Sequence, residues 1–301
     1  MTLAQLQYFK TLARVLHYTK AAEELHIAQP SLSYSIGELE KELGVKLFTK
    51  EDRKVLLTLY GEHFLPYVES ALATLSDGAN ELRQLSGSNM QEIRLGYFHS
   101  IASSLIPTLM AGLYRDEKNK NLRFQFTEAT SHEILSLLKS GDIDLAFCMH
   151  HDDWLESVPV MHQKLYLAVP KGHPLSGRKH VSFFDFADEP MVMLDKNNSL
   201  RILVDQMFSE NATIPNVRFV VRECNAALQY VALNFCVSIL PQVPAMETDR
   251  IDIIPIKSSS GDFCRTVYCS WMKNRPLSPA VKRVRSYIIG HFSLNDVIKN
   301  P

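Results

Sequence analysis

The chain has 301 residues, of which 46% are apolar and 22% are charged. This length suffices for two or three domains, and the composition excludes a disordered or fibrous protein. Lysine and arginine total 32 against 33 acidic residues, a net charge of -1, so DNA affinity cannot come from bulk positive charge. Five cysteines without zinc spacing, no signal segment and no long apolar run predict reduced thiols in a soluble, cytoplasmic protein without a membrane partner.

The first informative stretch is residues 18–36, which reads as two short helices with a tight connection. Thr19 is predicted to cap the first helix, and Pro30 suits the first turn of the second, where its missing N–H costs nothing. Small Ala21 and Ala22 allow the helices to cross closely. A buried stripe follows at helical spacing: Leu32, Ile36, Leu39 and Leu43. The pattern predicts a helix-turn-helix that inserts its second helix into the major groove, although an ordinary helical hairpin has the same pattern.

Residues 44–58 are predicted to form a turn and a small β-hairpin wing. Lys50, Arg53 and Lys54 lie at its tip, where cations can contact phosphates or simply be solvated. One long helix is predicted after Thr58, with a heptad seam: Phe64, Val68, Ala71, Leu75, Gly78, Leu82 and Leu85. The seam favours dimerisation, because a helix-turn-helix needs a two-fold partner to read two half-sites. Packing on its own domain is the alternative. Residues 86–89 have the composition of a hinge.

Beyond residue 90 the pattern changes to alternating strands and helices. Strands are predicted at 93–97, 122–127, 143–149, 165–169, 191–194, 217–221, 237–240 and 267–271, and helices at 103–114, 131–139, from 199, 226–234 and 279–289. This alternation is typical of parallel sheets covered by helices. The last strand and helix lack partners in the second half, so they are expected to return to the first. The result is two α/β lobes joined by two crossovers.

Several motifs in the first sixty residues resemble the winged helix-turn-helix of LysR-type transcriptional regulators. They are Tyr8-Phe9, Thr19-x-Ala21-Ala22-x-x-Leu25, Gln29-Pro30-Ser31-x-Ser33, Leu39-Glu40-x-x-Leu43-Gly44-x-x-Leu47-Phe48 and Leu57-Thr58-x-x-Gly61. The two lobes resemble the periplasmic-binding-protein-like α/β effector domain of the same family, so the resemblance covers the whole chain. It implies a winged domain at 1–58, a linker (dimerisation) helix at 59–88, effector lobe I at 89–161 with 267–301, and lobe II at 162–266.

The resemblance also implies which residues meet DNA. Those aligned with the major groove are Gln29, Pro30, Ser31, Ser33 and Tyr34. Gln29 can bond adenine in bidentate fashion. Tyr34 stands where many members have arginine, so contact with a phosphate or sugar is the alternative to guanine readout. Lys50 replaces a more frequent arginine, which keeps the charge and loses the forked geometry.

Polar side chains that follow predicted strands or open predicted helices are candidates for binding an effector. They are His99, Ser100, Thr130, Ser131, Asn198, Ser199 and Asn225. Ligands of two-lobed α/β folds lie between the lobes, and helix N-termini suit small anions. We therefore expect a small anionic effector here, although each residue alone can equally be a helix cap.

Peroxide sensing and catalysis are both disfavoured. In peroxide-sensing members of the family a reactive cysteine precedes Leu-Arg, whereas this chain has Ser199-Leu200-Arg201, and Phe208 replaces the later cysteine. Motifs for a nucleophile elbow, a phosphate loop or a dinucleotide site are missing, so no catalytic residue or cofactor is expected. His150-His151-Asp152-Asp153 is interpreted as a solvated loop rather than a metal site.

These observations predict a DNA-binding transcriptional regulator of the LysR type, acting as a homodimer or homotetramer. It is expected to bind an interrupted palindrome near a promoter, to respond to an effector between the lobes and to contact RNA polymerase. Two alternatives stay open. One is a small-molecule binding protein whose winged domain mediates protein contacts, and the other is an α/β enzyme with a fused regulatory domain.

Overall fold

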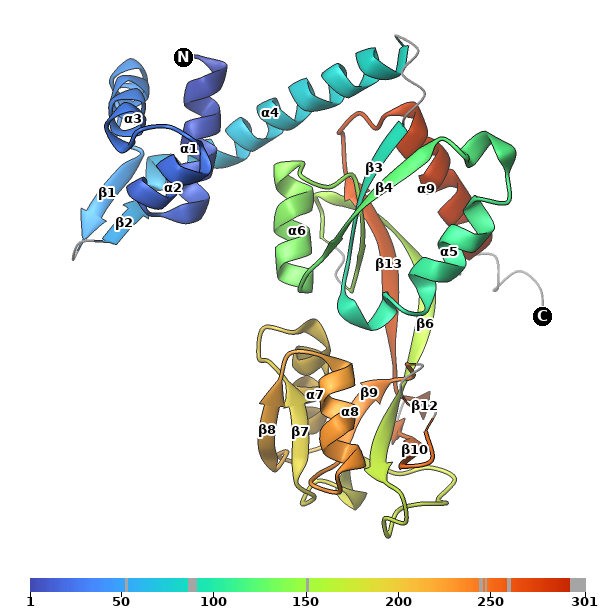
Figure 1. The fold of residues 1–301 in the computed structure, drawn as a ribbon. Coiled ribbons are helices and arrows are strands. Elements are labelled where there is room, and N and C mark those ends of the chain that lie inside the picture. The colour runs from blue at the N-terminus through green and yellow to red at the C-terminus, as the bar shows by residue number, and fades with distance from the viewer. Residues whose placement is uncertain are drawn as a thin grey trace. The chain divides into compact units, whose positions relative to one another are not determined.

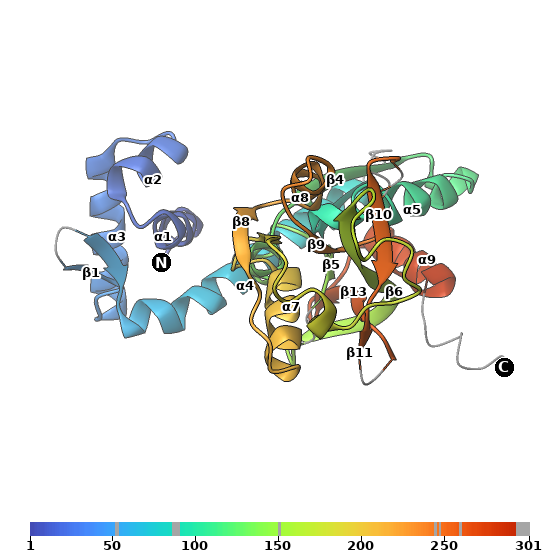
Figure 2. The same cartoon turned by 90° about the horizontal axis from the view of Figure 1, so that it is seen from below.

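The computed structural model describes residues 1–51, 54–85, 91–149, 152–243, 246, 248–258 and 261–292. The chain forms two compact units, and the predicted hinge at 86–89 lies outside the described residues. The first unit contains α1 (Leu3–Val15), α2 (Tyr18–Glu24), α3 (Gln29–Leu43), the hairpin β1 (Phe48–Glu51) and β2 (Lys54–Leu57), and α4 (Leu59–Leu85) (Figures 1 and 2). This is the predicted winged helix-turn-helix followed by a long helix.

The core of the winged unit is built on the residues that the helical spacing selects. Phe9 of α1, Ala21 of α2 and Leu32 of α3 are completely buried. The prediction that Thr19 caps α2 is wrong, because the Nδ1 atom of His17 accepts the Lys20 N–H at 3.4 Å. An imidazole nitrogen can accept a hydrogen bond as a hydroxyl does, so a histidine just before a helix is also a cap candidate.

The heptad seam of α4 has two parts with different environments. Phe64 and Val68 pack against the core of the winged unit, as expected for the alternative interpretation of the seam. Leu75 and Leu82 are 58% and 67% exposed in the single chain. Among the seam residues whose side chains the structure describes, Leu75 and Leu82 are the large apolar ones that a partner helix can cover.

The second unit consists of two lobes connected by two long strands (Figure 1). Lobe I contains β3 (Gln91–Tyr97), η1 (His99–Ile101), α5 (Leu105–Leu113), η2 (Glu117–Asn119), β4 (Leu122–Glu128), α6 (Ser131–Ser140), β5 (Leu145–Cys148) and α9 (Pro279–Phe292). Lobe II contains η3 (Phe183–Asp185), β7 (Met191–Leu194), α7 (Ser199–Glu210), β8 (Val217–Val221), α8 (Cys224–Ala232), β9 (Ser238–Pro241), β10 (Ile251–Pro255), β11 (Lys257–Ser258) and β12 (Gly261–Asp262). The connecting strands are β6 (Leu155–Pro170) and β13 (Cys264–Met272).

Parallel strand pairs occur in each lobe, whereas the pairings of the connecting strands β6 and β13 are antiparallel. β3 pairs in parallel with β4 and β5, and β7 pairs in parallel with β8. β13 is antiparallel to both β5 and β6, and β6 is antiparallel to β9 and β10. The strands predicted at 165–169 and 267–271 are therefore too short. The missing parts, residues 155–164 of β6 and 264–266 of β13, lack a regular alternation of polar and apolar residues, and they pair with each other or with the rest of the partner strand.

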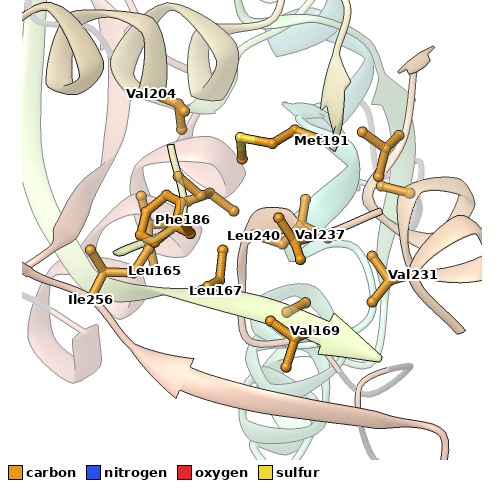
Figure 3. Close-up of a cluster of buried hydrophobic side chains, with 14 of the residues drawn as sticks. Leu165, Leu167, Val169, Phe186, Met191, Val204, Val231, Val237, Leu240 and Ile256 are labelled. Atoms are coloured by element: carbon orange, nitrogen blue, oxygen red, sulfur yellow. The ribbon is translucent and has the colours of Figure 1, made fainter. Parts of the chain in front are cut away.

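The core of lobe II surrounds the second half of β6 (Figure 3). Leu165, Leu167 and Val169 project from this strand toward Met191 and Val237 of the neighbouring segments. Phe208, at the position of the later cysteine in peroxide sensors, is 1% exposed, and its ring centroid lies 5.0 Å from that of Phe183. A side chain of this size fully buried contributes roughly 2 to 3 kcal/mol, so Phe208 is a core residue.

Candidate functional site

The candidate DNA interface is the exposed face of α3 together with the wing. Leu32, Ile36 and Leu39 fill the core, which turns the opposite face of α3 to solvent. The five predicted groove residues all lie on the exposed surface: Gln29, Pro30, Ser31, Ser33 and Tyr34. Tyr34 is the most open of the large apolar side chains on this helix at 72% exposure.

The structure brings four of the predicted DNA-binding residues together around one open hollow. Gln29 and Ser33 contribute from α3, and Lys50 and Lys54 from the wing. The Lys50 ammonium lies 5.6 Å from the centre of the Tyr18 ring, a cation–π contact that orients it at the hollow. Pro30, Ser31 and Tyr34 lie outside the hollow's lining, and Arg53 falls outside the described residues.

A buried glutamate fastens the wing to the recognition helix. Glu40 of α3 is 7% exposed. Its Oε1 accepts the N–H groups of Leu47 and Phe48 at 2.9 and 3.2 Å, and its Oε2 lies 2.6 Å from Lys46 Nζ. Sequence patterns place Glu40 only in a family motif. A further signal is its position directly after Leu39 of the buried stripe, where an acidic side chain needs partners.

The candidate effector site is a cavity of about 280 Å³ in the second unit. Its lining comes from both lobes and from β13, and it includes six of the seven predicted effector residues: His99, Ser100, Thr130, Ser131, Asn198 and Ser199. Asn225 lies outside this lining, and its predicted position at the opening of a helix is wrong. Helix α8 begins at Cys224 with Glu223 as its N-cap, so Asn225 lies inside the helix, is exposed, and is not part of the lining.

Two of the lining residues also cap helices. The Glu133 carboxylate accepts the Thr130 N–H at 2.9 Å and the Thr130 hydroxyl at 2.8 Å, and these bonds lower the pKa of Glu133. Asn198 Oδ1 accepts the Leu200 N–H at 2.9 Å. Capping and lining therefore occur in the same residues, because the helices start at the cavity wall.

Arg265 is a further residue of this cavity, and no sequence motif points to it. It is 4% exposed. Its Nε and Nη2 donate to Gln163 Oε1 at 2.9 and 2.5 Å, and Nη2 also donates to Ser100 Oγ at 2.5 Å. The guanidinium carbon lies 4.8 Å from the centre of the Phe98 ring. Sequence patterns start the strand at Val267, which left Arg265 in a predicted loop.

In the described part of the chain, Arg265 hydrogen-bonds to Gln163, Ser100 and Met149 and forms no ion pair with an acidic residue. Burial lowers the pKa of its guanidinium to about 10, so the group remains cationic at neutral pH. Among the described residues, its Nη1 donates to the Met149 sulfur at 3.4 Å and to no oxygen, and a thioether is a weak acceptor. The cavity thus contains a buried cation with hydrogen-bonding capacity to spare.

Cys224 and Ser199, the thiol and the serine considered for peroxide sensing, are both buried residues of the cavity lining. Cys224 is 3% exposed, and burial raises the pKa of its thiol to about 11. Such a group is a neutral thiol near pH 7 and a poor nucleophile.

Arg201, two positions after Ser199, donates to Leu194 O at 2.9 Å and to Asp205 at 2.8 Å. It fastens α7 to β7.

In the described part of the chain, no His, Cys, Asp and Glu side chains form a cluster of three or more suited to a metal ion. His150 and His151 fall outside the described residues. None of the described helices combines the length and the apolar character needed to span a bilayer.

Comparison with known proteins agrees with this architecture. Residues 3–62 match the model for the bacterial regulatory helix-turn-helix protein, lysR family, and residues 86–293 match the model for the LysR substrate binding domain. The HTH-type transcriptional regulator YybE of Bacillus subtilis is 34% identical over 291 residues, covering 96% of this chain and 98% of its own.

Two solved structures illustrate the likeness. A full-length OxyR variant from Pseudomonas aeruginosa has 25% identity and a TM-score of 0.67, covering 96% of this chain and 95% of its own. The effector binding domain of QuiR in complex with shikimate has 25% identity and a TM-score of 0.63, covering 67% of this chain and 97% of its own. Two matching family models and a full-length relative lead to one conclusion: this chain belongs to the LysR family of bacterial transcriptional regulators.

Proposed function

We propose that this regulator responds to a small anionic effector that binds Arg265 in the cavity of its α/β unit. The observation that carries the proposal is the buried guanidinium with no acidic partner among the described residues. An uncompensated buried charge costs several kcal/mol. A bound anion would offset that cost, so the site is built for a ligand of opposite charge.

The surroundings of Arg265 support the same ligand chemistry. The Ser100 hydroxyl is already oriented by Arg265, and the Ser199 end of α7 opens at the cavity wall. Backbone N–H groups at a helix start and the helix dipole favour a carboxylate or another small anion. The cavity of about 280 Å³ is near the lower end of ligand pockets, which suits a small metabolite.

On the DNA side, we propose that Gln29 and Ser33 contact base edges while Lys50 and Lys54 contact phosphates. All four surround the same hollow of the winged unit. Two copies, joined through the exposed part of the α4 seam, would read an interrupted palindrome near a promoter. Effector binding would alter the angle between the lobes and thereby DNA bending and contact with RNA polymerase.

The effector proposal is tested by binding of carboxylate probes to the full chain. Shikimate, the ligand of the QuiR domain, and benzoate are suitable first probes. Both should raise the thermal midpoint of the wild type but not of Arg265→Gln. Arg123→Gln, on the exposed face of β4, is the matched control and should respond like the wild type. Equal responses of the wild type and Arg265→Gln would contradict the proposal.

The DNA proposal is tested by selecting bound fragments from the source genome. The wild type should enrich an interrupted palindrome and bind it far more tightly than random DNA. The double variant Gln29→Ala, Ser33→Ala should lose this preference. Unchanged affinity and specificity would instead favour the alternative in which the winged domain mediates protein contacts.

A further inference from the structure

The cavity that contains Arg265 also has an acidic side. Glu128 ends β4 in lobe I, and Glu223 immediately precedes α8 in lobe II. The imidazole of His99 bridges them, with Nδ1 hydrogen-bonded to Glu128 and Nε2 3.5 Å from the Glu223 carboxylate. We call these three residues, Glu128, His99 and Glu223, the acidic rim.

The acidic rim has more acceptors than donors. A neutral imidazole carries one N–H and can satisfy one carboxylate, and even a protonated ring offers only two N–H groups to four carboxylate oxygens. In the described ranges neither Glu128 nor Glu223 forms an ion pair with a lysine or arginine. Their side chains are 40% and 53% exposed, so unused oxygens remain accessible to a ligand.

The other charges of the cavity lining do not change this balance. Glu133 is committed to capping α6 through Thr130. Arg222 lines the cavity as an exposed residue and interacts electrostatically with Glu133. A ligand with several negative charges would therefore meet Arg265 at one end and repulsion from the acidic rim elsewhere.

We infer that the effector has a single anionic group and also carries a hydrogen-bond donor, either a hydroxyl or an ammonium group. Its anionic group binds Arg265, as in the proposed function on which this inference rests, and its donor binds the acidic rim. Hydroxy acids and amino acids have this chemistry, whereas simple carboxylates and polycarboxylates lack it. Glu128 and Glu223 thereby become the residues that select among anions.

The same geometry links ligand choice to the state of the lobes. Glu128 and Glu223 belong to different lobes, and His99 is the group that now joins them. A ligand donor placed between the two carboxylates would strengthen that connection or replace it. Anions without a donor would fill the Arg265 end and leave the connection unchanged.

The test compares probes that differ only in the donor group. Benzoate is compared with its hydroxy and amino derivatives, hexanoate with norleucine, and tricarballylate serves as the polyanion. Calorimetric titration of the full chain should show the best donor-bearing probe binding about tenfold tighter than its parent, as expected for a hydrogen bond to a carboxylate. Tricarballylate should bind more weakly than either.

Glu223→Ala isolates the rim's contribution, because the Glu223 side chain makes no capping hydrogen bond to α8. This variant should bind the parent carboxylates as the wild type does and lose most of the preference for their donor-bearing derivatives. Glu210→Ala, at the far end of α7 from the cavity, is the matched control and should retain the preference.

The outcomes separate the two proposals. Equal affinity of the wild type for parent and donor-bearing probes, or a preference for tricarballylate, would overturn the inference and leave the role of Arg265 intact. Failure of every monoanion to bind the wild type would overturn the proposed function itself. Retention of the donor preference in Glu223→Ala would exclude Glu223 as its origin and contradict the assigned role of this residue in selecting among anions.

Discussion

Arg265 and Gln163 are direct cross-strand neighbours on β13 and β6, the two strands that connect the lobes. A neutral amide oxygen therefore holds the buried guanidinium, at 2.9 Å from Nε and 2.5 Å from Nη2. The register of this strand pair shifts between Val267 and Tyr268, close to the same point. A ligand that binds Arg265 acts directly on β6 and β13. The geometry of these two strands sets the angle between the lobes.

Replacing the amide by a carboxylate should close the anion site without unfolding the protein. In Gln163→Glu the new carboxylate neutralises Arg265, so the affinity for carboxylate probes should fall by about tenfold or more. Gln163→Leu is the control, since it adds no charge, removes the acceptor, and should lower stability by about 1 to 3 kcal/mol. Calorimetric titration and urea unfolding measure the two effects. Wild-type anion affinity in Gln163→Glu would contradict this role of Arg265.

Removal of the Glu40 carboxylate should loosen the wing. Glu40→Ala leaves the buried N–H groups of Leu47 and Phe48 without their acceptor, which should destabilise the winged unit by about 3 kcal/mol and weaken DNA binding. Lys46 is 76% exposed in its ion pair with Glu40, so Lys46→Ala should cost less than about 1 kcal/mol. Urea unfolding compares the variants, and similar losses in both would show that the ion pair, not the backbone bonds, holds the wing.

Lysine and serine variants of the winged unit should affect DNA binding in different ways. Lys50→Ala should weaken binding to all sequences and reduce the salt slope of log affinity by about 1, the value for one phosphate contact. Ser33→Ala should leave the salt slope unchanged and alter base preference. Fluorescence anisotropy at several salt concentrations, on selected and random DNA, measures both quantities. A changed salt slope in Ser33→Ala would place that residue on the backbone instead.

The buried thiol of Cys224 should make stability depend on alkaline pH. Burial raises its pKa from 9.0 to about 11 in the folded chain, so the folded state resists the deprotonation that the unfolded chain undergoes at lower pH. The resulting stability is complete below the unfolded pKa and is lost as pH rises toward about 11. The loss should reach roughly 2 to 3 kcal/mol.

Cys224→Ala provides the reference for this effect. The difference in urea unfolding free energy between wild type and variant should be constant around neutral pH and decrease above about pH 9. A difference that stays constant through the alkaline range would mean that the Cys224 thiol is not protected by burial.

The sequence by itself determined the elements whose residues are close along the chain. The stripe that includes Leu32 and Ile36 specifies the buried face of α3, and the opposite face is therefore the exposed one. The alternation of strands and helices specifies parallel βαβ units, and β3, β4 and β5 form one. Local periodicity is sufficient here, because it reports which side of each element is buried.

Only the tertiary structure decided the environment of the charged residues. Arg265 and Gln163 are 102 positions apart. Their burial follows from the long antiparallel pairing of β6 and β13, and such a pairing leaves no local pattern in the sequence. Likewise, Thr130 and Asn198 have the sequence signature of ordinary caps, whereas their presence in one cavity depends on the packing of two lobes. The hydrophobic pattern of the sequence indicates which face of each element is buried. The partner of a buried charge depends instead on how distant segments pack together.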